Sequence, residues 1–204
     1  MKKIVYVSME FSIEKLPIYA GGLGLLAGDI LYAANDLKIP FYGVTLISRK
    51  GYAKYKIENK DIILEEEGYE PIEYFNKEDE IFNINLKNLT IKFEVWRYSL
   101  PNVKLFLIDT NVPENPPWIR KLTDRLYFEE NQEERLLKDI ILGLGTLEIF
   151  DKLGVEIDKY HLNESHGGFL AIELLKRYNN TEEGRNKVVF TTHSIVAGHD
   201  SFPY

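Results

Sequence analysis

Runs of β-branched and aliphatic residues recur along the chain and predict short buried strands, because such runs suit a sheet that is covered on both faces. Five of them are bounded by polar or glycine-containing segments: Lys3–Ser8, Phe41–Ile47, Val103–Asp109, Tyr160–Asn163 and Val188–Thr192. Runs of about 4–8 residues have the length of strands rather than of helices.

Helical periodicity fills several of the intervals between these runs. Leu23–Leu37, Glu133–Leu153 and Gly167–Tyr178 each place apolar residues three or four positions apart. Strands that alternate with helices predict an α/β fold with a mainly parallel sheet, since parallel neighbours need a crossover connection.

Residues 50–101 follow a different pattern, in which polar residues alternate with aromatic or β-branched ones. This alternation is typical of antiparallel strands with one face in water. We expect an antiparallel elaboration on the edge of the sheet rather than a second domain. The following stretch, "NVPENPPW", is expected to be a loop fixed by its three prolines.

Composition narrows the class of protein. The chain has 204 residues, of which 45% are hydrophobic and 28% charged, as in a soluble globular domain. The net charge of -7 argues against a nucleic-acid-binding surface, and no apolar run reaches the length of about 20 residues that crosses a membrane. Cysteine is absent, which excludes disulfides, thiolate zinc sites and cysteine nucleophiles. Without a secretory signal we expect a cytoplasmic protein, and the scarcity of Met and Gln favours a thermophilic source.

Glycines 21, 22 and 24 open the first helix within "YAGGLGLLAGD", although glycine costs about 1 kcal/mol relative to alanine inside a helix. A dinucleotide fingerprint is one interpretation, but residues 9–20 separate the glycines from the strand and no acid ends the second strand. An anion site is another, with free amides at the helix N-terminus facing a phosphate. A tight turn with close helix packing is the third, and the glycines alone do not decide.

All four histidines, at positions 161, 166, 193 and 199, lie in the last quarter of the chain. His166 follows the fourth predicted strand within "HLNESH", and His193 follows the fifth. Ligands of doubly wound sheets bind beyond the carboxyl ends of the strands. We therefore expect the glycine loop, Asn163–His166 and His193 on one rim, and His199 in a structural or surface position.

Simpler explanations exist for part of this group. The side chain of Asn163 or Ser165 would be explained if it capped the next helix. Glu164 would be explained if its negative charge interacted favourably with the dipole at the N-terminus of that helix. A metal site is not expected, because the two histidines of "HLNESH" straddle a strand–helix junction and no H-E-x-x-H motif occurs. A Ser–His hydrolase is not expected either, since no G-x-S-x-G elbow is present.

Five ordered segments carry a further signal: "VSMEF", "LPIYAGGLGLLAGD", "LISRKGY", "HLNESHGGFLAIELL" and "VVFTTHSIVAGHDSFP". From Ser8 to Pro203 the chain resembles the N-terminal half of α-glucan (glycogen or maltodextrin) phosphorylases of the shorter prokaryotic type. The resemblance implies the GT-B architecture, with residues 1–204 as a Rossmann-like, doubly wound N-terminal domain and an active site in the cleft against a second domain. It also implies reversible, retaining phosphorolysis of α-1,4-glucan to glucose 1-phosphate.

The resemblance also implies roles for individual residues. The amides of Gly21, Gly22 and Leu23 would face phosphate groups, with Leu23 also lining the glucosyl subsite. His193 would hold the glucosyl 6-hydroxyl and turn its carbonyl toward the developing oxocarbenium charge. Glu164 would stand beside His193 and orient it, so these two are the catalytic residues expected.

Glu10, Asn163, His166 and Asn131 are the further substrate-binding residues that the resemblance implies. Asn131 belongs to a loop that departs from the family's glycine- and aspartate-rich form. Residues 135–139, "RLLKD", likewise stand where the family usually has an R-I-x-Q-E-type segment.

The family uses pyridoxal phosphate, whose phosphate group acts as proton donor and acceptor. The Schiff-base lysine lies on the second domain, which this sequence lacks, so no lysine here takes that role. We expect half of an active site that acts on α-1,4-glucan and phosphate with a separate C-terminal half polypeptide. A split gene is favoured over an excised fragment.

Two rivals stay open. A nucleotide-sugar-dependent glycogen or starch synthase shares the architecture and the GGLG loop, but it places a lysine where this chain has Tyr19. The other rival is a non-catalytic module that binds glucan or a partner.

Overall fold

A computed structural model describes residues 1–13, 16–52, 54–64 and 68–193. Its centre is a mainly parallel, eight-stranded sheet with the order β10–β9–β1–β2–β8–β7–β5 and with β6 paired to β7. The strands are β1 Ile4–Val7, β2 Phe41–Leu46, β5 Asn76–Lys77, β6 Phe82–Leu86, β7 Leu89–Ser99, β8 Val103–Asp109, β9 Lys159–Asn163 and β10 Val188–Thr191. The predicted α/β class is therefore confirmed.

The order of the parallel strands reverses between β1 and β9. From β1 the chain adds β2 and then β8 on one side, and β9 and then β10 on the other. Val7 is in register with both Val44 and Leu162, so the carboxyl ends of three strands are level. In an open α/β sheet this reversal is where ligands bind.

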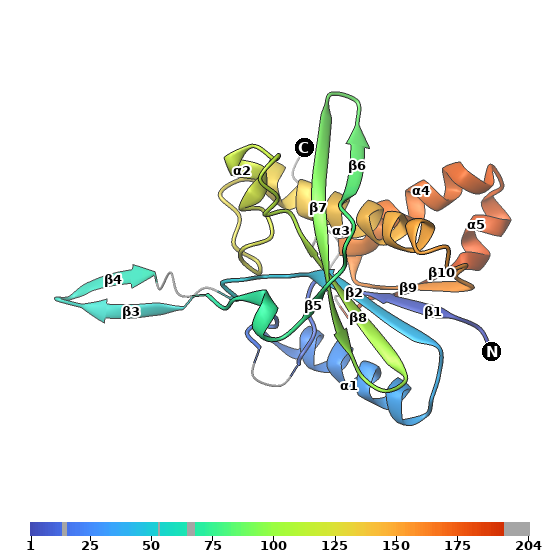
Figure 1. The fold of residues 1–204 in the computed structure, drawn as a ribbon, viewed down its shortest axis with the longest axis horizontal. Coiled ribbons are helices and arrows are strands. Elements are labelled where there is room, and N and C mark those ends of the chain that lie inside the picture. Colours follow the sequence, from blue (N-terminus) through green and yellow to red (C-terminus); the bar gives the residue numbers. More distant parts are fainter. Residues whose placement is uncertain (14–15, 53, 65–67, 194–204) are drawn as a thin grey trace.

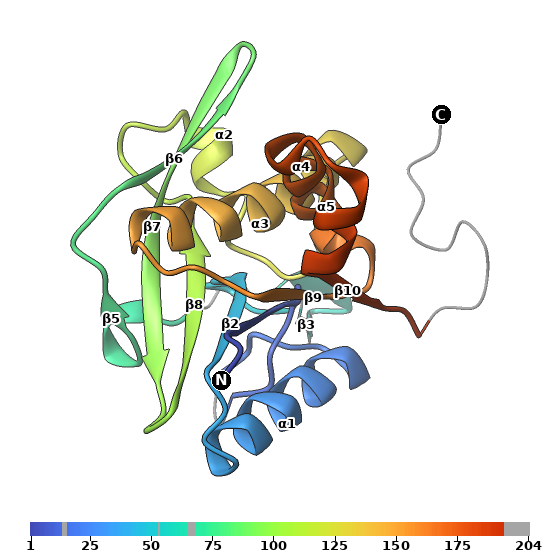
Figure 2. The ribbon, with the colours of Figure 1, turned by 90° about the vertical axis from the view of Figure 1, so that its right-hand side faces the viewer.

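Helices cover both faces of the sheet (Figures 1 and 2). Helix α1 (Gly22–Asp36) lies on one face, and α3 (Gln132–Lys152), α4 (Gly168–Tyr178) and α5 (Thr181–Lys187) lie on the other. Successive strand residues point to opposite faces. Thus Tyr6 belongs to the core cluster of α1, whereas Val5 and Val7 belong to that of α3 and α4. No helix in these residue ranges is both long and apolar enough to span a membrane.

The predicted helices and the five predicted strands are confirmed to within one residue at each end. Helix α5 was not predicted, and neither were the 3-10 turns η1 (Pro71–Glu73) and η2 (Ser165–Gly167). The proline-rich segment is also not a loop throughout, because α2 (Pro117–Arg120) begins at Pro117. A proline fits the first position of a helix, since the amide it lacks would have no partner there.

The antiparallel stretch divides into two parts. β5, β6 and β7 extend the sheet beyond β8, as expected. β3 (Tyr55–Glu58) and β4 (Asp61–Leu64) instead pair only with each other, in a hairpin that projects from the body in Figure 1. Its turn residues Asn59 and Lys60 both have positive φ, which is the geometry of a tight two-residue hairpin turn.

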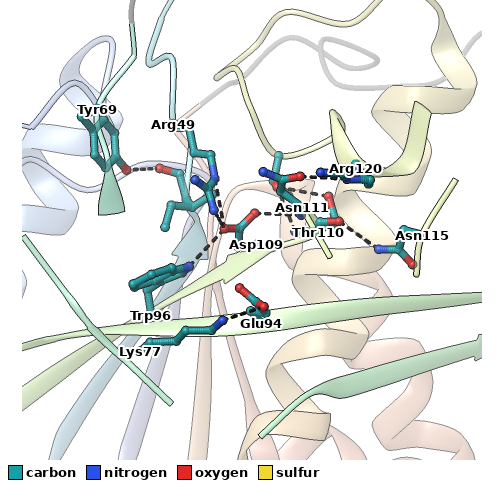
Figure 3. Close-up of polar contacts among 12 residues, drawn as sticks. Arg49, Tyr69, Lys77, Glu94, Trp96, Asp109, Thr110, Asn111, Asn115 and Arg120 are labelled. Atoms are coloured by element: carbon teal, nitrogen blue, oxygen red, sulfur yellow. Dashed lines mark hydrogen bonds and ion pairs between the residues drawn. The ribbon is translucent and has the colours of Figure 1, made fainter. Parts of the chain in front are cut away.

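A buried carboxylate, Asp109, fixes the chain where β2 and β8 end (Figure 3). It accepts hydrogen bonds from Arg49 Nε (3.1 Å), Trp96 Nε1 (3.0 Å) and the amide of Asn111 (2.9 Å). A buried charge without such partners would be strongly destabilising. The contacts therefore hold Arg49 in place, just before the segment that leads to the hairpin.

The pH dependence of stability is expected to report on His161 in β9. Its ring centroid lies 4.7 Å from that of Tyr6, and its Nε2 is 2.7 Å from Thr191 Oγ1. Burial lowers the pKa of His161 below its usual 6.5. The unfolded chain therefore takes up a proton at this residue more readily than the folded chain does. The stability that the buried, neutral His161 ring contributes is complete above about pH 6.5 and is lost as the pH falls below that value.

His161→Asn removes the titrating ring and should flatten this pH dependence. The measurement is the urea midpoint of both proteins over the range from about pH 7.5 to 5. Parallel curves for the two proteins would show that His161 does not contribute to it.

Candidate active site

A cavity of about 710 Å³ lies at the strand-order reversal. Its lining comes from the segment after β1, the start of α1, the loop before α3 with α3 itself, and the ends of β9 and β10; the main residues are Glu10, Gly22, Leu23, Tyr127, Lys138, Asp139, Glu164, His166 and His193. The strand-end argument predicted this convergence of the glycine loop, the "HLNESH" segment and His193.

The glycines of the loop serve two different purposes. A Cβ at Gly22 would have no atom within 4 Å, so the backbone there borders open space. A Cβ at Gly24 would lie 2.4 Å from Tyr19 Cβ and 2.7 Å from Glu10 Oε2. At Gly28 it would lie 2.4 Å from the carbonyl oxygen of Ser12. Gly24 and Gly28 therefore permit close packing, while Gly22 leaves room for a ligand.

The start of α1 presents free amides to this space. The first intrahelical bond runs from Leu25 N to Gly21 O (3.2 Å), so the amides of Gly22 and Leu23 have no acceptor within the helix. No side chain caps this end. Such amides, together with the helix dipole, favour an anion. Gly21 differs from the expectation, because its amide donates to Glu10 Oε2 (3.2 Å) and not toward the cavity.

Glu10 ties three segments together and is only 2% exposed. Its Oε2 accepts from the amides of Ala20 and Gly21, and its Oε1 accepts from the hydroxyl of Tyr127 (2.8 Å). Tyr127 has a positive φ of 52°, which is uncommon for an aromatic residue. The carboxylate thus fixes the glycine loop relative to the loop before α3.

Tyr127→Phe should weaken this connection without opening a cavity. For the phosphorolysis that the resemblance implies, loss of a hydrogen bond to a carboxylate is expected to lower kcat/KM about tenfold. The measurement is steady-state kinetics, with Tyr74→Phe, an exposed tyrosine outside the cavity, as the control. Equal kinetics for both variants would reduce Tyr127 to a packing residue.

Glu164 has strained backbone angles (φ 63°, ψ -173°) that side-chain-bearing residues avoid. Three contacts hold it there. Its amide donates to Thr191 O (2.9 Å), and its carboxylate accepts from the hydroxyl of Thr192 (2.9 Å) and from the amide of His193. Glu164 therefore fixes the path of the chain as it leaves β10.

Asn163 holds the ring of His193. It is completely buried, with its Oδ1 3.3 Å from His193 Nε2 and its Nδ2 donating to Ser8 Oγ (3.2 Å). Neither Asn163 nor Ser165 caps the following helix, which has no side-chain cap. The capping explanation is therefore wrong, and Asn163 instead links β1, β9 and His193.

His166 lies in the cavity wall, 8% exposed. Its Nδ1 is 3.1 Å from Asp139 Oδ1, and its ring centroid is 5.9 Å from that of Tyr127. A carboxylate beside Nδ1 fixes the orientation of the ring and favours a proton on that nitrogen. The other ring nitrogen is then left to contact a ligand.

Among the described residues that line the cavity, Lys138 is the one lysine, and its ammonium group has hydrogen-bond partners within the protein. Its ammonium group donates to the carbonyl oxygens of Arg125 (2.8 Å) and Phe128 (3.2 Å) and to Glu129 Oε1 (2.8 Å). These three acceptors match the three N–H bonds of an ammonium group. Lys138 therefore holds the loop before α3.

The contribution of α3 was not predicted, although a signal was present. Lys138 and Asp139 precede the buried Leu142 by four and three positions, so they lie on the apolar face of the helix. Charged residues at such positions indicate a site. Asn131 does not line the cavity; its side chain caps α3 by accepting from Glu134 N (3.0 Å).

Two further expectations concern His199 and a metal site. His199 lies outside the described residues. Across residues 1–13, 16–52, 54–64 and 68–193, no group of His, Cys, Asp or Glu side chains is placed to hold a metal ion.

Comparison with known proteins supports the resemblance noted in the sequence. No family model matches the chain. It is 36% identical to the glycogen phosphorylase of Aquifex aeolicus over 100% of this chain and 32% of that protein. It is 34% identical to the maltodextrin phosphorylase of Thermococcus litoralis and to the glycogen phosphorylase of Mycobacterium tuberculosis, over 98% of this chain and 26% of each. The chain thus spans about a quarter to a third of these relatives.

A solved structure supports the fold class. The catalytic domain of starch synthase IV from Arabidopsis thaliana, bound to ADP and acarbose, matches 93% of this chain and 33% of its own with a TM-score of 0.60. At 14% identity this likeness concerns the fold alone, and it confirms the GT-B-type α/β architecture.

Proposed function

Because this chain is a sequence relative of glycogen and maltodextrin phosphorylases over nearly its whole length, we propose that it forms one wall of the active site of an α-1,4-glucan phosphorylase. The observation that carries the proposal is the geometry of the cavity. Free amides at the start of α1 and the fixed His193–Glu164 pair border the same space. An anion and a sugar ring can therefore bind there side by side.

Each part of this wall has a separate task. The amides of Gly22 and Leu23 bind anionic phosphate oxygens, because preorganised N–H donors and the helix dipole stabilise negative charge. His193 binds a glucosyl hydroxyl through its ring, while Asn163 and Glu164 hold it at the cavity. The hydrogen bonds of Glu10 to Gly21 and to Tyr127 hold the glycine loop in a fixed position relative to the loop before α3.

The described residues fit the phosphate end of pyridoxal phosphate but not its aldehyde. Gly22 leaves open space above unpaired amides, as a phosphate group requires. Lys138 cannot serve as the Schiff-base lysine while its ammonium group donates to three acceptors. When bound in the complete enzyme, the cofactor's phosphate supplies proton transfer toward the substrate phosphate.

The remaining wall is proposed to come from the polypeptide that matches the part of the glycogen phosphorylases that this chain does not cover, hereafter the second chain. Phosphorolysis needs a closed cleft, because water would otherwise capture the glucosyl group and release glucose. This wall alone leaves the cavity open. We therefore expect no activity from this chain by itself.

The test is to purify this chain, mix it with the second chain of the same organism, and assay glucose 1-phosphate formed from maltodextrin and phosphate. Activity should arise only in the mixture and should co-elute with a complex in gel filtration. Activity of this chain alone, in a preparation free of the second chain, would contradict the proposal.

A parallel assay separates the rival functions. Glucosyl transfer from ADP-glucose to maltodextrin, with no dependence on phosphate, would identify a synthase. A complex that binds maltodextrin but shows neither reaction would identify a non-catalytic module.

A further inference from the structure

The hairpin formed by β3 and β4 has one apolar and one polar face. Residues directly opposite each other in an antiparallel pair lie on the same face. The pairs Tyr55–Leu64 and Ile57–Ile62 therefore share a face that is entirely apolar. The alternate pairs place Lys56, Glu58 and Asp61 on the opposite face, which is polar apart from Ile63.

This apolar face is open to solvent. Tyr55, Ile57 and Ile62 are 60%, 78% and 74% exposed, and the hairpin forms a two-stranded sheet of its own. An isolated two-stranded hairpin is marginally stable in water. A contiguous exposed apolar patch with a polar reverse side marks an interaction surface.

The patch continues from the hairpin onto the body of the protein. A second cavity, of about 450 Å³, is lined by Leu64 of the hairpin, by Trp118 and Phe128, and by charged residues that include Lys121, Arg125 and Glu134. Trp118 is 48% exposed and Phe128 39% exposed. Large aromatic residues at a hollowed surface are typical anchors of protein interfaces.

This surface adjoins the proposed active site. Lys138 lines both cavities. The base of the hairpin is tied to the loop that carries Tyr127, through Lys50 N to Asp124 O (2.7 Å) and Leu126 N to Gly51 O (3.0 Å). The hairpin also follows β2 in the chain, and β2 pairs with β1 at the strand-order reversal. A polypeptide that closes the active-site cavity therefore meets the hairpin beside it.

We propose that the apolar face of the β3–β4 hairpin and the Trp118–Phe128 hollow dock the second chain. The inference rests on the proposed function, and it adds the surface that binds this partner. The relatives support a polypeptide partner rather than a small ligand, because two thirds or more of their length has no counterpart here. The partner is expected to present an apolar surface to the hairpin.

The test compares two double variants in binding to the second chain. Ile57→Thr/Ile62→Thr removes the apolar face but keeps β-branched residues, so the strands persist. Lys56→Thr/Glu58→Thr is the matched control on the opposite face. By isothermal titration calorimetry, the first should raise Kd about 30-fold or more, and the control about threefold at most.

Three results would overturn the proposal: equal Kd values for the wild-type chain and the apolar-face variant, no complex with the wild-type chain, or self-association of this chain alone that the apolar-face variant abolishes. The last would assign the face to a second copy. Glucose 1-phosphate formation separates this proposal from the proposed function. An inactive complex weakened by the apolar-face variant contradicts the function alone, and an active complex unaffected by it contradicts the docking surface alone.

Discussion

His193→Ala in the assembled enzyme is expected to lower kcat/KM for phosphorolysis by a factor of about 10²–10³, the range found when a transition-state contact is lost. Its ring lies at the cavity and is held by Asn163, while Glu164 fixes its backbone. The alanine variant keeps that backbone bond and removes only the ring. The loss should therefore fall on the contact with the sugar.

Phe190→Ala is the control for this experiment, because Phe190 is 55% exposed on β10 and does not line the cavity. Its kcat/KM should stay within about twofold of the wild-type value. Binding of the second chain and pyridoxal phosphate content should be unchanged in both variants. Near-normal turnover of His193→Ala would reduce His193 to a structural residue.

Gly22→Val is expected to raise the KM for phosphate about 100-fold, as loss of two hydrogen bonds to an anion implies. The added side chain meets no protein atom at its Cβ and φ is not positive there, so the chain should fold normally. Its bulk would occupy the space above the amides of Gly22 and Leu23. Phosphate affinity should therefore fall while the thermal midpoint stays nearly constant.

Gly168→Val provides a matched control. Gly168 is likewise the first residue of a helix and borders open space, but it does not line the cavity. This variant should retain the wild-type KM for phosphate. An unchanged phosphate dependence in Gly22→Val as well would show that the glycines of α1 serve packing alone.

The sequence by itself determined the elements of the fold and their alternation. Strands such as Phe41–Leu46 are continuous apolar runs because both faces of the sheet are covered, and this signal is local. The apolar periodicity also placed the end of α1 and the start of α3 to within one residue, whereas the cap that Asn131 provides was not predicted. The glycine loop, "HLNESH" and His193 each follow a strand of the parallel part of the sheet. The convergence of these three segments was predictable, because parallel strands present their carboxyl ends at one edge.

Only the tertiary structure decided which atoms face the cavity. Glu10 could be named as a wall residue, but its bonds to Gly21 and Tyr127 depend on segments 11 and 117 residues away in the chain. These bonds make the Gly21 amide unavailable and leave the amides of Gly22 and Leu23 for a ligand. No local pattern encodes that distribution, because it arises from how the loops pack against each other.

The same holds for the hairpin and for the charged residues on the buried apolar face of α3. Alternation predicted strands between residues 50 and 101, but β3 and β4 have the same period whether they join the sheet or stand apart. Pairing partners are set by long-range packing, which periodicity does not contain. The roles of Lys138 and Asp139 likewise depend on acceptors and on His166 brought in from other segments. Sequence determined the elements and the rim, and the packing of loops on that rim determined the site.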